Sequence, residues 1–342
     1  MTRKSDLSPF GHSRVESETE IIQTYLAPLA QGMPGALGLT DDAAVITVDP
    51  GSNIVVSSDP IIAGVHFFPS DRAEDVAWKA LAVNVSDIAA KGARPFAYIM
   101  TLAFPEAPER AWLSLFAQGL ATAQVEFGCV LVGGDTDRTP GPLSIGITMI
   151  GTVPKGGFVR RRGAAAGDHV FVTGTIGDAA LGLAIHRDAA LFSDVLTDGD
   201  RSLLVGRYLR PSPRHALADV LRHHASAALD VSDGFLKDLR RLAEPFGISL
   251  KLDSVPISQP VRAALARDPK VADAILGGGD DYELIVAVPP QEAASFAEDA
   301  LKAGVNVTEV GVLEDGADVC VLDADGDLIE PRRYGYDHFL RS

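Results

Sequence analysis

Aspartates stand beside glycine, serine or threonine at five places along the chain, each next to a predicted apolar strand. A sixth carboxylate, Asp87, falls near the C-terminal end of a predicted apolar helix, where the helix dipole disfavours an unneutralised negative charge. Carboxylates placed in this way repel one another unless a cation neutralises them. The five motifs are Thr40-Asp41-Asp42, Ser57-Ser58-Asp59, Gly133-Gly134-Asp135-Thr136, Asp230-Val231-Ser232-Asp233-Gly234 and Gly278-Gly279-Asp280-Asp281.

Hard divalent cations are the natural counter-ions for such a set of oxygen-bearing side chains. Mg²⁺ prefers carboxylate and other oxygen ligands, and it shares phosphate oxygens with the protein. The serine hydroxyls are further oxygen donors, and the glycines let backbone N–H groups approach a phosphate closely. Each motif alone is also typical of a turn or a helix N-cap, but five of them in one chain favour a shared metal–nucleotide site.

The familiar signatures of other nucleotide and metal sites are missing from the sequence. It contains no G-x-x-x-x-G-K-[ST] loop, no G-x-G-x-x-G motif opening a helix after a strand, and no protein-kinase glycine loop. H-E-x-x-H, C-x-x-C and G-x-S-x-G are also missing, which argues against a zinc hydrolase and against a serine hydrolase. The acidic run from Asp323 to Asp327 lacks the glycine spacing of a calcium loop, so it predicts a hairpin turn.

Composition limits the class of protein further. The 342 residues include 30 Lys and Arg against 46 Asp and Glu, which gives a net charge of −16. A field of that sign disfavours nucleic acid and anionic membranes as partners. Cys129 and Cys320 are too few for a disulfide framework or a four-cysteine zinc site. Because the sequence has neither a secretory signal nor an apolar run of roughly 18 residues, we expect a soluble, cytoplasmic protein.

Strands and helices alternate in both halves of the chain, which predicts an α/β (α+β) fold of two domains. Hydrophobic periodicity predicts helices over 17–29, 75–90 and 109–127, and strands over 43–48, 54–57, 129–132 and 143–153. A stretch dense in glycine and arginine near 155–167 predicts the boundary between the domains. We expect a flexible N-terminus over 1–16, one domain over 17–155 and a second over 156–342, which closes with a hairpin at 319–329.

Taken in order, these motifs resemble those of the thiamine-monophosphate kinases, a family of the AIR synthetase (PurM-like) superfamily. The similarity extends from about residue 17 to the C-terminus. Each matching piece is short, but the ordered set is specific. Besides the aspartate motifs, the matching segments are Gly64-Val65-His66-Phe67, Lys79 through Ala90, Val172 through Asp178, Leu209-Arg210-Pro211 and Gly335 through Phe339.

The resemblance implies a fold, a reaction and a set of partners. It implies a two-domain PurM-like fold in which the N-terminal domains of two subunits form a shared barrel, hence a homodimer. The implied reaction is direct in-line phosphoryl transfer from ATP to thiamine monophosphate, giving thiamine diphosphate and ADP, with several Mg²⁺ ions. No catalytic acid or base is implied, because the attacking phosphate is already ionised at neutral pH, and catalysis is then mainly charge neutralisation and alignment.

The resemblance also assigns residues to roles, position by position. Asp42, Ser57, Ser58, Asp59, Asp87, Asp135, Asp230 and Asp233 would form the metal site. Gly134, Asp135, Arg161 and Ser232 would contact ATP, and His66, Asp280 and Tyr336 would contact the thiamine substrate. The sequence departs from the family pattern at Thr40 and Asp280, which replace the usual Gly and Glu. Ala117 stands where some relatives carry an ATP-contacting tyrosine.

Two alternatives remain open from the sequence. The first is another PurM-like ATP-dependent enzyme that acts on a different acceptor. The relatives that use a reactive cysteine near the N-terminus or at the C-terminus fit poorly, because residues 1–40 and the closing Leu340-Arg341-Ser342 contain none. The second is a non-catalytic protein that binds divalent metal ions, which would explain the carboxylates but not the ordered glycine loops.

Overall fold

The computed structural model describes residues 13–339 except 317, 333 and 338. Most of the predicted flexible N-terminus, residues 1–12, therefore lies outside the described residues. The chain forms two compact units. The first comprises the described parts of Met1–Thr47 together with Ser58–Leu81 and Ala97–Thr148, and the second comprises Val48–Ser57, Ala82–Phe96 and the described parts of Met149–Ser342. The predicted domain boundary after residue 155 stays a prediction.

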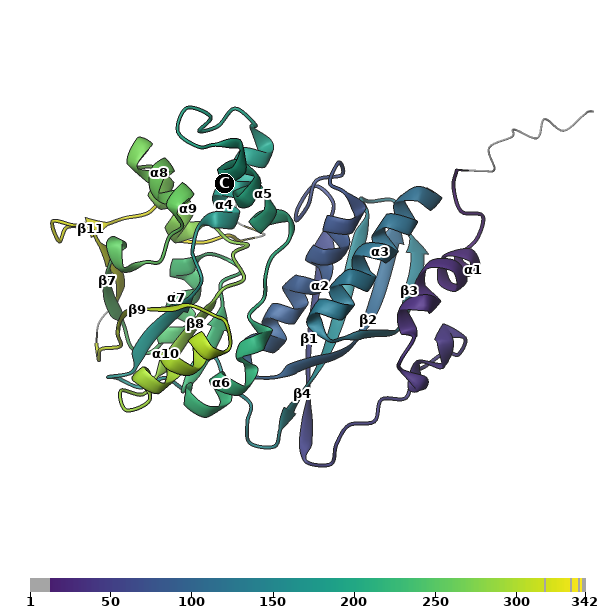
Figure 1. Ribbon diagram of the computed structural model, residues 1–342, viewed down its shortest axis with the longest axis horizontal. Coiled ribbons are helices and arrows are strands. Elements are labelled where there is room, and N and C mark those ends of the chain that lie inside the picture. Colours follow the sequence, from purple (N-terminus) through teal and green to yellow (C-terminus); the bar gives the residue numbers. More distant parts are fainter. Residues whose placement is uncertain (1–12, 317, 333, 338, 340–342) are drawn as a thin grey trace, which may run out of the picture. The chain divides into compact units, whose positions relative to one another are not determined.

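A four-stranded sheet of order β1-β4-β2-β3 is the first layer of the fold. Its strands are β1 (Ser52–Ile62), β2 (Arg94–Phe104), β3 (Val130–Arg138) and β4 (Ser144–Pro154). Helices α2 (Ala73–Ala90) and α3 (Arg110–Phe127) lie together against this sheet (Figure 1). The inward face of α3 carries Leu113, Phe116, Leu120, Ala123 and Phe127, which recur at helical spacing and are buried.

Most predicted elements of this half are confirmed, with one error and one omission. The segment 17–29 is helical, as three short pieces: α1 (Glu18–Glu20), η1 (Ile21–Leu26) and η2 (Ala27–Ala30); η3 (Pro34–Leu39) follows. The predicted strand 43–48 is wrong: Val45 is 67% exposed, and its N–H donates to the Gly35 carbonyl instead of to a strand. Strand β2 was not predicted.

A second sheet of order β6-β8-β5-β9 organises the second half of the chain. Its strands are β5 (His169–Thr173), β6 (Ala227–Asp230), β8 (Leu284–Val288) and β9 (Val307–Val312), and the neighbours pair antiparallel. All residues of β6 and β8 are buried, which requires cover on both faces. Helices α6 (Ala218–His224) and α10 (Ala293–Lys302) pack on one face. Helices α4 (Asp178–Arg187), α7 (Phe235–Ala243) and α9 (Val271–Gly277) pack on the other.

Smaller elements complete this half. A three-stranded sheet pairs β10 (Val319–Leu322) with β7 (Ile248–Lys251) in parallel and with β11 (Leu328–Ile329) antiparallel, which confirms the predicted closing hairpin. Helix α5 (Asp198–Leu209) begins at a capping box formed by Thr197 and Asp200. Short turns η4 (His215–Leu217) and η5 (Leu252–Ser254) precede α6 and follow β7. Helix α8 (Gln259–Arg267), α9 and β9 were not predicted.

Candidate active site

Two serine–aspartate pairs stand at the centre of the candidate site in the second unit. The Ser57 hydroxyl on β1 donates to the carboxylate of Asp87, which lies in the last turn of α2. The Ser86 hydroxyl donates to Asp230 Oδ2 over 2.7 Å, at the end of β6. Ser86 and Asp230 are both buried. Since Ser86 and Asp87 are adjacent, the end of one helix brings together carboxylates and hydroxyls from three distant parts of the sequence.

Burial and neighbouring charges shift the pKa values of this cluster. Burial, and after it the neighbouring charge of Asp87, raises the pKa of Asp230 to about 7. Lys91, four residues after Asp87, is the cation beside them, and its ammonium donates to the Ala228 carbonyl over 2.9 Å. Burial lowers the pKa of Lys91, whereas Asp230 and Asp87 act to raise it and Arg161 acts to lower it. Arg161 therefore belongs to the same electrostatic neighbourhood.

A cavity of about 590 Å³ opens beside these groups. Its size falls in the range of small-molecule sites. Polar groups at the cavity come from Asn53, Ser57, Asp87 and Lys91, and the other lining residues are apolar: Ile54, Val55, Val56, Ile88, Val153 and Phe158. A cavity with an apolar wall and a charged end suits a ligand that joins an apolar group to a charged group.

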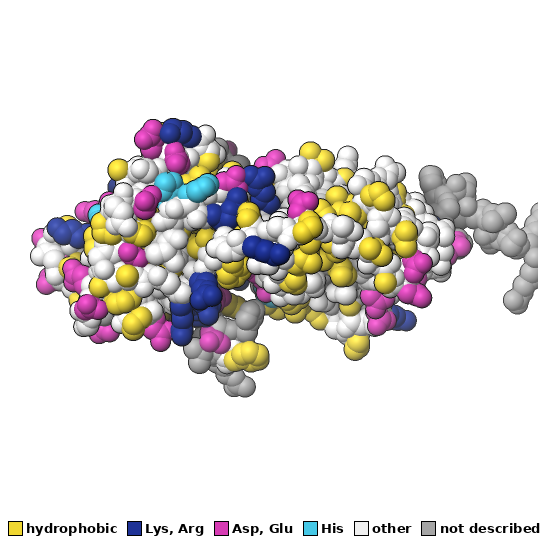
Figure 2. All heavy atoms as spheres, turned by 90° about the horizontal axis from the view of Figure 1, so that it is seen from below, with side chains coloured by type: hydrophobic (Ala, Val, Ile, Leu, Met, Phe, Trp, Pro, Cys, Tyr) yellow, Lys and Arg dark blue, Asp and Glu magenta, His cyan; other side chains and the backbone are white. Residues whose placement is uncertain are grey.

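The negative net charge does not extend evenly over the surface. Figure 2 shows Lys and Arg side chains gathered in several groups on a face that otherwise mixes hydrophobic and acidic side chains. Local basic groups can attract an anionic ligand although the whole protein is acidic. The net charge of −16 is therefore compatible with a phosphate-bearing substrate.

Backbone contacts join three loops of the second unit into one surface. The Asp280 N–H donates to the Ser232 carbonyl over 3.0 Å, and the Tyr336 N–H donates to the Asp233 carbonyl over 2.7 Å. Gly279 permits the first contact, because a Cβ there would stand 2.3 Å from the Ser232 oxygen. Four predicted site residues, Ser232, Asp233, Asp280 and Tyr336, are thus brought together.

The predicted ligand Asp233 already has cationic partners in this arrangement. Its carboxylate lies 3.0 Å from Lys237 Nζ and 2.8 Å from an Arg241 nitrogen. The buried Asp238 carboxylate accepts the N–H groups of Ser232 and Asp233, at 3.1 and 2.9 Å, which fixes the loop at the start of α7. These partners would have to share Asp233 with a metal ion.

The remaining predicted residues lie in the first unit. Asp42 is exposed in a bend after η3, and Asp59 follows Ser58 on β1. The Ser58 hydroxyl donates to the Ile147 carbonyl over 3.1 Å, and His66 Nδ1 accepts the Ile62 N–H over 3.0 Å. Gly134 and Asp135 lie on β3, where Asp135 Oδ1 accepts the Thr136 N–H over 2.9 Å.

The donors present fit a hard divalent cation, although they do not form a complete metal cluster. Among the residues that the structure describes, no group of three or more His, Cys, Asp or Glu side chains is placed to hold a metal ion. What the second unit does assemble is all oxygen: the carboxylates of Asp87 and Asp230 and the hydroxyls beside them. Burial and the nearby charge of Asp87 disfavour the ionised form of Asp230, and a divalent cation bound there would favour it.

Sequence reasoning missed Lys91, Ser86 and Asp238. Lys91 carried a detectable signal, because its i,i+4 spacing from Asp87 is the spacing at which helical charges meet. Ser86 lies 144 residues from its partner Asp230, so no local pattern could have paired them. Asp238 carried a detectable signal, because it is an acidic residue in the first turn of a predicted helix.

Family models identify the class of protein that this fold and site define. The AIR synthase related protein N-terminal domain matches residues 40–153, and the AIR synthase related protein C-terminal domain matches residues 165–323. The structure of HypE, a hydrogenase maturation protein of Escherichia coli, shares the fold, with a TM-score of 0.74 at 18% identity over 93% of this chain and 99% of that chain.

Relatives with higher sequence identity to this chain carry a more specific name. The chain is 40% identical to the thiamine-monophosphate kinase of Caulobacter vibrioides, over 94% of this chain and 91% of the relative. It is 36% identical to the enzyme of the same name from Escherichia coli K12, over 89% and 92%. The crystal structure of thiamine-monophosphate kinase from Stenotrophomonas maltophilia matches with a TM-score of 0.76 at 39% identity, over 85% and 90%. The structure of AaThiL complexed with AMPPCP and TMP matches with a TM-score of 0.74 at 30% identity, over 87% and 91%.

This chain belongs to the thiamine-monophosphate kinase family. The resemblance drawn from the motifs, the two-domain PurM-like fold and the class of enzyme are confirmed. A search of the described residues finds no helix that is both long and apolar enough to cross a membrane.

Proposed function

We propose that this protein transfers a phosphoryl group from ATP to thiamine monophosphate, giving thiamine diphosphate and ADP. Relatives that are 34–40% identical over at least 89% of this chain carry the name thiamine-monophosphate kinase. The AaThiL structure, with AMPPCP and TMP bound, supports a nucleotide and a thiamine phosphate as the two ligands. The observation within this chain that carries the proposal is the pairing of Ser57 with Asp87 and Ser86 with Asp230 beside a cavity of about 590 Å³.

Several Mg²⁺ ions are part of the proposal. In the second unit Ser57, Asp87, Asp230 and Asp233 would hold metal ions, and in the first unit Asp42, Ser58, Asp59 and Asp135 would do so. When bound, Mg²⁺ neutralises and orients the phosphate oxygens of donor and acceptor. Carboxylate and hydroxyl oxygens are the ligands that this cation prefers, and the carboxylates of Asp87 and Asp230 with their serine hydroxyls support a cation there.

The chain's own residues supply binding, orientation and fixed charge. Both reactants are phosphates and repel each other, so alignment and charge neutralisation are the main needs of the reaction. Arg161, Gly134, Asp135 and Ser232 would contact ATP, and the Arg161 guanidinium suits phosphate oxygens. The acceptor phosphate is already ionised at neutral pH, so direct in-line transfer requires no protein base.

The thiamine substrate would be bound by His66, Asp280 and Tyr336. The backbone bond from Tyr336 to Asp233 supports a place for Tyr336 beside the loop that carries Ser232. Tyr336 is 44% exposed, and an aromatic side chain suits stacking on an aromatic ligand. Asp280 is one methylene shorter than the family's usual Glu, so its contact with the substrate would be longer or water-mediated.

A homodimer and a cytoplasmic location complete the proposal. Strand β1 is an edge of the first sheet, and an edge strand has backbone groups that can pair with a second copy of the chain. Both cysteines are unpaired, and ATP is the proposed donor, so a reducing compartment that holds ATP fits this chain.

An assay with ATP, thiamine monophosphate and Mg²⁺ tests the proposal directly. We expect thiamine diphosphate and ADP to form in equal amounts and the reaction to stop when a chelator removes the metal. ATP binding without product would point to another acceptor in the same family fold. Neither binding nor product would contradict the nucleotide site and leave a metal-binding protein.

Lys91 gives a second test, which measures metal binding and not turnover. Replacing Lys91 with Met removes a positive charge beside Asp87 and Asp230, so Mg²⁺ should bind about 3- to 10-fold more tightly in the absence of nucleotide. Titration calorimetry at pH 8 would measure the dissociation constant. Lys91→Arg, which keeps the charge, and Lys155→Met, which changes a lysine outside the cavity, should both bind like the wild type. Unchanged or weaker binding in Lys91→Met would contradict a metal site at Asp87 and Asp230.

A further inference from the structure

The loop that carries Asp280 has an unusual backbone. Asp280 and Tyr282 have φ values of +70° and +51°, in the left-handed region that residues with a Cβ rarely adopt. The two residues flank Asp281. A backbone of this kind persists only where surrounding contacts hold it. We therefore expect the neighbouring side chains to make such contacts.

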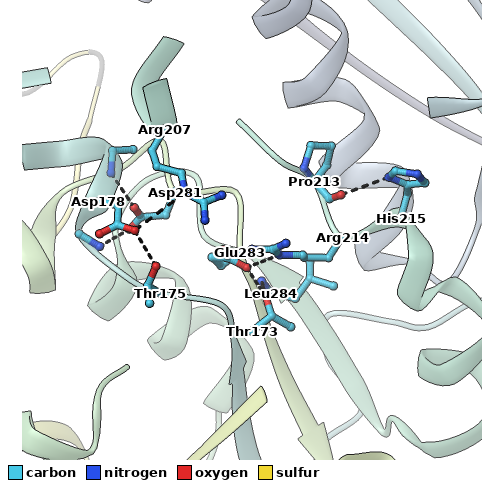
Figure 3. A network of polar contacts seen from close by, with 12 residues as sticks. Thr173, Thr175, Asp178, Arg207, Pro213, Arg214, His215, Asp281, Glu283 and Leu284 are labelled. Carbon is cyan, nitrogen blue, oxygen red and sulfur yellow. Dashed lines mark hydrogen bonds and ion pairs between the residues drawn. The ribbon is translucent and has the colours of Figure 1, made fainter. Parts of the chain in front are cut away.

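Asp281 is tied to the start of helix α4. Its Oδ2 accepts the Gly177 N–H over 2.8 Å and its Oδ1 accepts the Ala179 N–H over 3.2 Å. Helix α4 has ten residues, and its own N-cap, Gly177, has no side chain that could satisfy these donors. Figure 3 shows Asp281 lying beside Asp178 and Thr175, at this end of the helix. The carboxylate therefore caps a helix that is about 100 residues away in sequence.

Glu283 is a second anchor, one residue beyond Tyr282. It is buried, and its carboxylate accepts from Arg214 Nε over 2.5 Å and from the Thr173 hydroxyl over 2.6 Å. Figure 3 shows Arg214 and Thr173 meeting Glu283 from two different segments. The carboxylates of Asp281 and Glu283 thus accept hydrogen bonds from other segments of the second unit. Asp280, in the same loop, is the residue assigned to the substrate.

Backbone hydrogen bonds connect this loop to the neighbouring Asp230–Gly234 loop. Tyr282 N–H donates to the Val231 carbonyl over 2.9 Å, and Val231 N–H donates to the Glu283 carbonyl over 2.8 Å. Asp280 N–H bonds to the Ser232 carbonyl in the same manner. A change in the backbone at Asp281 would therefore reach Asp280 first and Ser232 second.

We infer that Asp281 is a positioning residue for the thiamine substrate: its bonds to Gly177 and Ala179 hold the left-handed backbone on either side and so aim Asp280 at the substrate. This inference rests on the proposed function, because Asp280 is assigned to the thiamine phosphate there. Asp281 itself touches the start of α4 and acts through its neighbour.

The variants Asp281→Ala and Asp281→Asn test this role in the full chain. Alanine removes both acceptor oxygens, whereas asparagine keeps one. We expect the KM for thiamine monophosphate to rise about 10-fold or more in Asp281→Ala and less in Asp281→Asn, with a several-fold smaller rise in the KM for ATP, because Ser232 is the more distant of the two residues from Asp281. Calorimetric binding of thiamine monophosphate should weaken in the same order.

Asp168→Asn is the matched control for loss of stability alone. Asp168 is also a buried carboxylate of the second unit that accepts two hydrogen bonds: its Oδ2 accepts the Ala165 N–H over 2.9 Å and the Ser226 hydroxyl over 2.5 Å. This variant should lower the melting temperature without changing either KM.

Several results would overturn the inference. One is a folded Asp281→Ala protein whose KM for thiamine monophosphate matches the wild type, and another is an equal rise in both KM values. If Asp281→Ala does not fold, the same criteria apply to Asp281→Asn. A wild type that neither converts nor binds thiamine monophosphate refutes the proposed function, and the inference then falls with it. A wild type that turns over normally beside unaffected variants refutes the inference alone.

Discussion

Asp87→Asn is expected to lower kcat/KM by about 10²–10³-fold or more while the protein stays folded. The substitution keeps the size of the side chain and an oxygen that can accept from the Ser57 hydroxyl. It removes the negative charge that, with Asp230, would hold a metal ion. The measurement is the initial rate of thiamine diphosphate formation at saturating Mg²⁺, with circular dichroism to confirm the fold.

The melting temperature of the same variant is a second readout, because the stability of the metal-free protein should not fall. Asp87 is one of the two charges that disfavour ionised Asp230, and it lies near the negative end of the α2 dipole. Removing that charge relieves repulsion in the metal-free protein, so the melting temperature should stay the same or increase. Asp49→Asn changes an exposed carboxylate in the turn before β1 and is the control for charge alone. A fully active Asp87→Asn enzyme would contradict the assignment of Asp87.

Gly134→Ala is expected to lower the free energy of unfolding by about 3 kcal/mol, the upper end of the usual cost of overpacking. Strands β2 and β3 pair in parallel with Gly134 opposite Met100. A Cβ at Gly134 would stand 1.8 Å from the Met100 carbonyl oxygen, so one of the two strands must move. Because Asp135 follows directly, the movement would also displace a predicted site residue. Urea denaturation measures the loss of stability.

The preceding glycine provides the matched control. A Cβ at Gly133 would meet no heavy atom within 4 Å, so Gly133→Ala should change the free energy of unfolding by no more than about 0.5 kcal/mol. The two variants differ by one position and have the same added methyl group. Equal stability of both proteins would contradict the close approach of β3 to β2 that places Asp135.

Local chemistry explains what the sequence could predict of this protein. Asp87 at a helix end and Asp230 at a strand end were both identified from residue types beside short apolar segments. Helices α2 and α3 were predictable for a similar reason, since their apolar residues recur at helical spacing. Strand β10 and its hairpin partner β11 followed from the acidic turn between them.

Long-range contacts explain what the sequence could not predict. The bond from Ser86 to Asp230 spans 144 residues, and that from Gly177 to Asp281 spans 104. The segment 43–48 has the composition of a strand but lies exposed, because strand formation depends on a partner that the pattern does not specify. The ion pair of Asp233 with Lys237 has i,i+4 spacing, but the one with Arg241 joins residues eight positions apart and had no local signal.

A single-turnover experiment with ATP labelled at its γ-phosphate tests the central claim most directly. The enzyme, in excess over labelled ATP, is mixed with thiamine monophosphate and Mg²⁺, and the label is followed in every product. We predict that the label appears on the terminal phosphate of thiamine diphosphate at the rate at which ATP disappears, with none on the protein. Label that accumulates as inorganic phosphate, or on the protein before it reaches thiamine, would contradict direct transfer between the two phosphates.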